Sequence, residues 1–258
     1  MKLVESLKRG LEILQSFSVE QPRLRLQEIA LQTNLPKPTA YRLLRTLLGL
    51  EYVRFDPVAN EYQLGPRVLS LGFTAILNLD LRETALPYIE ELFRKTEQTV
   101  NLGILDGRDV VYIVRIKQPK SLNLDLYVGS RLNVYRSCIG RAILAHLEAV
   151  KYDELMSEFS DDPEAVEFIG KDGSKLFKEL VRVRRKGYAL NDGEFLRDHR
   201  VAAAPVFNAA GEVEGAVNIA VLSRQCSRKT LINEYVPLLL ETTRAISNNL
   251  GYLGQHWR

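Results

Sequence analysis

Hydrophobic residues in the first fifty positions recur three times with the period of an α-helix. Leu7, Leu11 and Leu14 lie three or four residues apart and predict a first amphipathic helix that ends near residue 18. Residues 26–33 predict a short second helix, and a third is expected from about Pro36, because proline can open a helix without a capping side chain. Three short helices with a turn before the last are typical of a helix-turn-helix, whose last helix reads DNA.

The outward face of the third helix carries side chains that suit a DNA major groove. These cationic or hydrogen-bonding residues are Lys37, Thr39, Tyr41, Arg42, Arg45 and Thr46. Arginine can hold guanine through two hydrogen bonds, and lysine and tyrosine can hold phosphates. Exposed helices often carry such charges without any ligand. The order of the elements, more than the charge itself, therefore supports a DNA reader.

Two short alternating segments, residues 52–55 and 61–64, follow the third helix and predict a β-wing. Pro57 and Asn60 lie between them and favour a turn. Arg54, on the first strand of the wing, joins the residues expected to contact DNA. Between residues 37 and 54, four cations stand against one carboxylate, a local balance of 4 − 1 = +3. We therefore expect a winged helix-turn-helix domain over residues 1–65.

Beyond residue 65 the pattern predicts a linker helix over residues 66–80 and then a mixture of strands and helices. Residues 99–105 and 109–117 are expected to pair across Asp106-Gly107, a strong hairpin signal. The remaining expected elements are a strand over 122–128, a second hairpin of 200–208 with 213–222, and helices over 81–98, 139–147, 174–186 and 229–250. This order argues for an α+β domain over residues 81–258.

Composition is that of an ordinary globular protein, with 258 residues, 46% hydrophobic residues and a net charge of +3. Cys138 and Cys226 lie far apart and fit neither a disulfide framework nor zinc knuckles, which favours a reducing compartment. The first residues do not resemble a signal peptide, and no apolar stretch is long enough to span a bilayer. We therefore expect a cytoplasmic protein that does not act on a membrane.

The usual signatures of enzyme and cofactor sites are missing from the sequence. It contains no glycine-rich phosphate loop and no G-x-S-x-G motif, and its three histidines have no ligand spacing. We therefore expect no enzyme activity, no cofactor and no metal. The alternative is an enzyme or metabolite-binding module that uses Cys138, with the winged domain mediating protein contacts. No histidine is visibly placed to activate that thiol, and cysteine more often serves as a small apolar filler.

Several motifs, in order along the chain, resemble the IclR family of bacterial regulators. They are SLKRGLEIL at 6–14, LPKPTAYRLL at 35–44, YQLGPRVL at 62–69, IGRAILA at 139–145, GYALNDGE at 187–194 and AAAPVF at 202–207. The resemblance implies a DNA-binding dimer, often a dimer of dimers, whose second domain is a GAF-like antiparallel sheet flanked by helices. It also implies that a small acid in that domain changes how the protein contacts operator DNA or polymerase.

The same resemblance carries over a set of effector-binding positions. They are Ser137, Cys138 and Gly140 at the start of a helix, followed by Asp192, His199, Val201, Asn218 and Ala220. Family members often have small hydroxyl residues at the last two positions, so Asn218 offers an amide where a hydroxyl is usual. A helix N-terminus at residues 137–140 would suit a carboxylate. Arg136 beside it could pair with that carboxylate, or could be an exposed surface cation.

Other segments are closer to the branch of the family that controls protocatechuate and p-hydroxybenzoate breakdown. They are residues 67–73, 102–107, 111–115 and 187–192. The likeness implies a regulator of a catabolic operon that senses a small aromatic acid or another organic acid. Release from DNA and activation by the effector would use the same parts, so the sign of regulation stays open.

Overall fold

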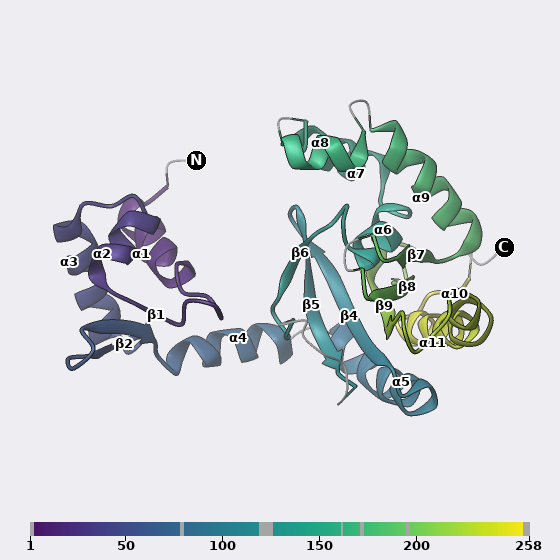
Figure 1. Cartoon of the computed structure of the whole chain (residues 1–258), viewed down its shortest axis with the longest axis horizontal. Coiled ribbons are helices and arrows are strands. Elements are labelled where there is room, and N and C mark those ends of the chain that lie inside the picture. Colours follow the sequence, from purple (N-terminus) through teal and green to yellow (C-terminus); the bar gives the residue numbers. More distant parts are fainter. Residues whose placement is uncertain are drawn as a thin grey trace. The chain divides into compact units, whose positions relative to one another are not determined.

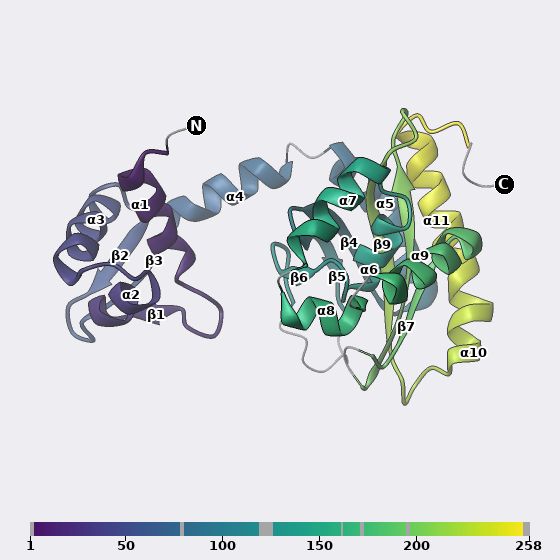
Figure 2. The same ribbon diagram turned by 90° about the horizontal axis from the view of Figure 1, so that it is seen from above.

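A computed structural model of the chain describes residues 3–77, 80–118, 126–160, 162–170, 173–194 and 197–254, with only the backbone of residues 73 and 75–77. The chain divides into two compact units, Met1–Asn78 and Leu79–Arg258 (Figures 1 and 2). The expected linker helix is α4, Arg67–Leu77, and belongs to the first unit. The finer boundaries at residues 65 and 80 stay predictions.

Besides α4, the first unit contains three helices and a small sheet. The helices are α1 (Glu5–Gln15), α2 (Leu26–Gln32) and α3 (Lys37–Gly49), and the strands are β1 (Arg23–Leu24), β2 (Val53–Asp56) and β3 (Glu61–Leu64). The antiparallel strand order is β1-β3-β2, so β2 and β3 form the expected wing and the two-residue β1 extends it. Ile13, Ile29, Leu44 and Val53 meet in one core that fixes α3 against the other helices.

The turn into α3 follows from local chemistry. Asn34 adopts a left-handed backbone conformation with φ 52°, which asparagine tolerates better than most residues. Leu35 then donates its backbone N–H to the carbonyl oxygen of Ala30, at 2.9 Å. Pro36 stands at the N-cap without a side-chain hydrogen bond, as expected for a proline-led start.

A six-stranded antiparallel sheet forms the centre of the second unit, in the order β6-β5-β4-β9-β8-β7. Its strands are β4 (Thr99–Asp106), β5 (Asp109–Ile116), β6 (Arg131–Asn133), β7 (Ala189–Asp192), β8 (His199–Phe207) and β9 (Val213–Leu222). The two predicted hairpins are β4–β5 and β8–β9, and they join along β4 and β9, where Asn101 lies opposite Asn218. The predicted α+β class, with an antiparallel sheet flanked by helices, is confirmed.

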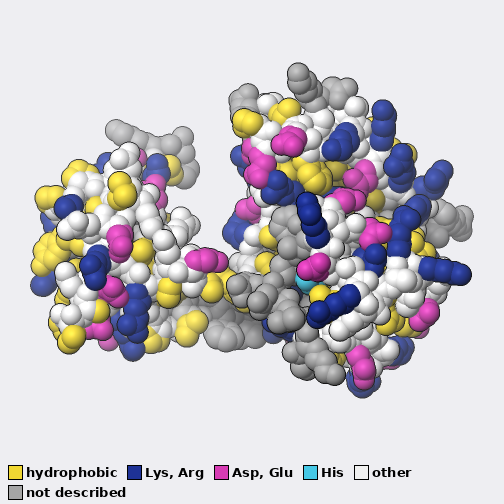
Figure 3. Space-filling view, viewed as in Figure 1, with side chains coloured by type: hydrophobic (Ala, Val, Ile, Leu, Met, Phe, Trp, Pro, Cys, Tyr) yellow, Lys and Arg dark blue, Asp and Glu magenta, His cyan; other side chains and the backbone are white. Residues whose placement is uncertain are grey.

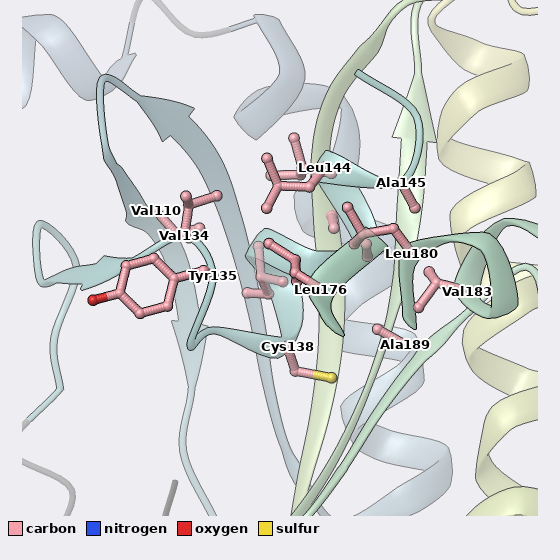
Figure 4. Packing of buried hydrophobic residues seen from close by; sticks show 14 of the residues in the cluster. Val110, Val134, Tyr135, Cys138, Leu144, Ala145, Leu176, Leu180, Val183 and Ala189 are labelled. Carbon is pink, nitrogen blue, oxygen red and sulfur yellow. The ribbon is translucent and has the colours of Figure 1, made fainter. Parts of the chain in front are cut away.

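Helices cover both faces of this sheet (Figures 1 and 2). They are α5 (Asp80–Thr96), α6 (Cys138–Leu144), α7 (Ala149–Glu158), α8 (Pro163–Ile169), α9 (Ser174–Lys186), α10 (Arg228–Thr230) and α11 (Val236–Asn249). One core packs α6 to α9 against one face, and a second packs α5 and α11 against the other. Figure 4 shows the first core, in which Leu176, Leu180 and Val183 of α9 lie near α6. The short α6 is therefore held between the sheet and α9.

Some predicted elements differ from the structure. The strand expected at 122–128 lies largely outside the described residues, and its described end, residues 126–128, is not a strand. The single helix expected over 229–250 is interrupted by a π-helical turn, Leu231–Tyr235. Pro237 follows that turn and has no N–H to donate, so a regular α-helical hydrogen bond cannot form there. The helices α7 and α8 and the outer strands β6 and β7 were not expected from the sequence.

Candidate DNA-binding surface and effector cavity

The outward face of α3 carries the side chains predicted to contact DNA. Those of Lys37, Tyr41, Arg42, Arg45 and Thr46 are exposed, and that of Thr39 is half-buried. Ala40 and Leu44 are fully buried on the opposite side of the same helix. The amphipathic pattern of α3 therefore presents its polar residues to solvent, and Arg54 is exposed on β2 of the wing.

The cations of this surface are available for an anionic partner. Other arginines of the first unit pair with carboxylates: Arg25 with Glu61 at 3.7 Å and Arg67 with Glu51 at 3.4 Å. Within the part of the chain that the structure describes, no carboxylate lies within ion-pair distance of Arg42, Arg45 or the other two cations on α3 and β2. Phosphates could therefore bind there without breaking internal ion pairs.

The second unit contains a cavity between the sheet and the N-terminal end of α6. Its lining residues are Thr99, Asn101, Tyr112, Arg115, Gln118, Leu126, Leu132, Arg136, Ser137, Cys138, Asn191, His199, Val201, Asn218, Ala220 and Leu222. The volume open to the centres of water-sized molecules is about 60 Å³. Seven of the nine predicted effector positions lie in this wall, namely Arg136, Ser137, Cys138, His199, Val201, Asn218 and Ala220.

The other two predicted effector positions, Gly140 and Asp192, are not among the described lining residues of the cavity. A Cβ atom at Gly140 would lie 1.9 Å from the carbonyl oxygen of Val134, so this glycine allows α6 to pack closely against the preceding segment. Asp192 accepts a hydrogen bond from Nε of Arg200 at 2.6 Å. It is absent from the described lining residues, where its neighbour Asn191 stands instead.

The two features expected to attract a carboxylate at the start of α6 are already engaged within the protein. Arg136 lies in the wall, but its Nη2 pairs with Oε1 of Glu164 at 2.6 Å. Ser137 caps α6 by accepting the backbone N–H of Gly140 on its hydroxyl oxygen, at 3.3 Å. This cap satisfies one of the N–H groups that a ligand would otherwise meet.

A chain of polar side chains crosses the floor of the cavity and was missed in the sequence. Arg115 of β5 donates from Nη1 to Oδ1 of Asn101, at 2.8 Å. Asn101 of β4 donates from Nδ2 to Oδ1 of Asn218 on β9, at 2.7 Å. Both asparagines are buried. A polar residue inside an otherwise apolar strand, as in Val100-Asn101-Leu102, is the signal that could have revealed this chain.

The cavity favours a negative charge. Its described lining includes Arg115, Arg136 and His199 but neither aspartate nor glutamate. Burial lowers the pKa of the Arg115 guanidinium, because few water molecules remain to solvate its charge. Burial also lowers the pKa of His199, and nearby Arg115 adds to that effect. An anion bound between Arg115 and His199 would raise the pKa values of both side chains.

The thiol of Cys138 is poorly suited to nucleophilic chemistry. Burial raises its pKa to about 12, and its Sγ–H donates to the carbonyl oxygen of Val201 at 3.4 Å. Among the described residues, no group of three or more His, Cys, Asp or Glu is placed to hold a metal ion. Within the same residues, none of the helices combines the length and the apolar character that a membrane span requires.

Comparison with known proteins identifies both units. Residues 6–57 match the IclR helix-turn-helix domain, and residues 73–248 match the C-terminal domain of the bacterial transcriptional regulator IclR. The chain belongs to the IclR family. It is therefore a DNA-binding transcriptional regulator with an effector-binding C-terminal domain, and the IclR family is not enzymatic.

Individual IclR relatives align over nearly the whole chain. The Pca regulon regulatory protein of Pseudomonas putida is 30% identical, with 95% of this chain and 84% of that protein covered. The regulator XynR of Escherichia coli strain K12 is also 30% identical, with 98% and 99% covered. The crystal structure of an IclR family regulator from Brucella abortus is 31% identical, with a TM-score of 0.79 and 96% and 93% covered.

Proposed function

We propose that this protein controls a catabolic operon by binding operator DNA through α3 and the wing, with a small organic acid in the cavity changing that binding. The charge of the cavity wall is the observation that supports an acid as the effector. Arg115 lines the cavity without a carboxylate partner among the described residues, and the described lining contains neither aspartate nor glutamate. A bound carboxylate would supply the missing negative charge. Such a regulator would act where the operator is, in the cytoplasm.

The proposal leaves room for an aromatic or another organic acid. Likeness to the protocatechuate and p-hydroxybenzoate branch supports an aromatic acid, but the relatives named for the Pca regulon and XynR are equally similar at 30% identity. The volume of about 60 Å³ counts only the positions open to the centre of a water-sized molecule, so the space that the atoms of a ligand can fill is larger. Both a short acid and a benzoate-sized acid therefore stay within the proposal.

We also propose that the protein binds DNA as a dimer, with a dimer of dimers as the larger assembly. Val4, Leu7 and Leu11 are exposed on one face at the start of α1, and Leu69 and Leu71 are exposed on α4. A symmetric pair of such faces would bury these apolar side chains. Two copies would present two recognition helices to a palindromic operator.

Fluorescence anisotropy with DNA from the protein's own upstream region tests the regulator. Arg42→Ala and Arg45→Ala are expected to weaken operator binding, and each lost phosphate contact should reduce the slope of log K against log salt by about 0.9. Lys8→Ala is the matched control, because Lys8 lies on α1 and pairs with Glu12 at 3.8 Å. Equal, weak binding of the wild-type protein to all duplexes would contradict the proposal.

The effector is tested in the same assay by adding protocatechuate, p-hydroxybenzoate, glyoxylate or a short-chain acid. At least one acid should change operator affinity in a saturable way, and should raise the melting temperature of the protein by mass action. If only the non-aromatic acids change operator affinity, the effector is not an aromatic acid. The proposed role as a transcriptional regulator is then unaffected.

A further inference from the structure

Within the part of the chain that the structure describes, Arg115 differs from the arginines around it in having no carboxylate partner. It is half-buried on β5 and its guanidinium donates to one amide oxygen, that of Asn101. Among the residues that the structure describes, no aspartate or glutamate lies within 4.0 Å of it. An arginine has five N–H donors, so most of those on Arg115 remain available for a ligand.

Neighbouring arginines of the second unit are neutralised internally. Arg136 pairs with Glu164 at 2.6 Å. Arg141, which is fully buried on α6, pairs with Glu179 at 2.6 Å and Glu194 at 2.7 Å. Of the two arginines in the cavity wall, Arg115 therefore contributes the uncompensated charge.

We propose that Arg115 binds the carboxylate of the effector, and that the cavity selects small monocarboxylic acids. This assignment rests on the proposed function, and it names the side chain that binds the effector. The planar guanidinium can hold both oxygens of a carboxylate through two parallel N–H···O bonds. Asn101 holds the guanidinium in place by its amide oxygen, and Asn218 in turn fixes the orientation of Asn101.

The rest of the wall restricts the effector to one negative charge and an apolar body. Arg136, the other arginine of the lining, already pairs with Glu164, so a second carboxylate would lie beside an ion pair that is complete. Apolar side chains of the described wall include Leu126, Leu132, Val201 and Leu222. Burial of a second charge against them would cost more than burial of a methylene chain or a ring.

Isothermal titration calorimetry of the full chain with benzoate and butyrate tests the assignment, with benzamide and butyramide as neutral counterparts. The wild-type protein should bind at least one of the acids, and should bind it more tightly than its amide. Succinate, which is butyrate-sized with a second carboxylate, should bind more weakly than butyrate. Tighter binding of succinate would overturn the preference for monocarboxylic acids.

Two substitutions separate the role of Arg115 from a general loss of structure. Arg115→Met should weaken binding of the preferred acid at least about thirty-fold, the equivalent of losing one partner of a buried charge pair, and should weaken amide binding much less, because the amide loses only a neutral acceptor contact. Asn101→Asp keeps the shape of the side chain but places a carboxylate beside Arg115 Nη1, so it should weaken acid binding by competing internally. Arg131→Met on β6 is the matched control and should change affinity less than about threefold, since Arg131 is absent from the described cavity lining and pairs with Asp106 and Asp109.

The outcomes distinguish the assignment from the proposed function. If the wild-type chain binds the acids and Arg115→Met binds them equally well, Arg115 is not the carboxylate site and the effector class survives. If the wild-type chain binds neither acid, the effector class fails together with the assignment. Operator binding by Arg115→Met, measured without any acid, should match that of the wild type and shows that the variant is folded.

Discussion

At the scale of single residues, the start of α6 shows how position determines the chemistry of a side chain. Cys138 lies at the wall of the proposed effector cavity, where a thiol could in principle act as a nucleophile. Instead it is 5% exposed and donates to a backbone carbonyl. The surrounding apolar side chains disfavour the thiolate, which is the reactive form. Cys138 therefore contributes packing and a weak polar contact to the cavity.

We expect Cys138 to react slowly with a thiol reagent. Because burial raises its pKa to about 12, almost no thiolate is present near neutral pH. Labelling of the native protein with Ellman's reagent at about pH 8 should be at least about a hundred-fold slower than labelling in denaturant. Comparison of the wild type with Cys226→Ser assigns the signal to Cys138, and rapid native labelling of that variant would contradict the expectation.

His199 should make the unliganded protein sensitive to mild acid. Burial lowers its pKa, Asp198 opposes that shift and Arg115 adds to it, so the folded-state pKa lies below the unfolded value of about 6.5. As the pH falls, the unfolded state therefore binds the proton first. The free energy of unfolding decreases from about pH 6.5 down to the lower pKa of the folded state. Calorimetric melting of His199→Gln should show a smaller decrease in Tm than the wild type between about pH 7.5 and pH 5.5. Equal decreases in the two proteins would show that His199 does not contribute.

At the scale of elements, the packing of α6 depends on a glycine. Gly140 was predicted as an effector position, but the closest atom to its missing Cβ is the carbonyl oxygen of Val134. Backbone atoms cannot move aside as a flexible side chain can. A larger residue would therefore push α6 away from the segment before it and alter the cavity wall indirectly.

Gly140→Ala is expected to destabilise the second unit by about 2–3 kcal/mol, the usual cost of overpacking a rigid core site. Chemical denaturation followed by circular dichroism measures this change. The control is Gly10→Ala on α1, where a Cβ would meet no atom within 4 Å. That control should be neutral or stabilising by about 1 kcal/mol, because alanine favours a helix over glycine. An unchanged midpoint for Gly140→Ala would mean that α6 shifts freely.

Local patterns were sufficient to predict the hairpins and the winged unit. Asp106-Gly107 makes a turn in which Gly107 has φ 58°, and the amphipathic pattern of α3 gives its buried and exposed faces correctly. Arg115 was missed because its role depends on the pairing of two hairpins. Asn101 meets Asn218 across 117 residues, a register that no local pattern reveals. Short helices such as α8, with seven residues, also give too little periodicity to stand out.

At the scale of the whole molecule, positive charge is not confined to the DNA-binding unit. Figure 3 shows dark blue side chains gathered over the part of the second unit where α9 lies. The exposed cations of this helix are Lys175, Lys178, Arg182, Arg184, Arg185 and Lys186. A net charge of +3 therefore does not indicate by itself which surface meets DNA. The helix-turn-helix order, and the arginines of α3 that have no carboxylate partner among the described residues, support the proposed surface more specifically.

Assembly should depend on the apolar face of α1. Leu7 and Leu11 are 64% and 51% exposed, so Leu7→Glu with Leu11→Glu should place charges in the proposed dimer contact. Sedimentation velocity is expected to show a shift from dimer toward monomer, with weaker operator binding. Leu31→Glu is the control, since Leu31 is 83% exposed on the neighbouring α2. A dimer that persists in the double variant would mean that other surfaces hold the two copies together.

The strand order of the large sheet has a consequence for how copies of this protein can meet. The outer strands β6 and β7 have three and four residues, whereas the inner strands have eight to ten. On β6, Arg131 also pairs with Asp106 and Asp109, which places charge along that border. Short, charged borders give a second chain little backbone to pair with, so growth of the sheet from one copy into another is disfavoured. Concentrated solutions of the folded protein should therefore show little tendency to form fibrils through this sheet.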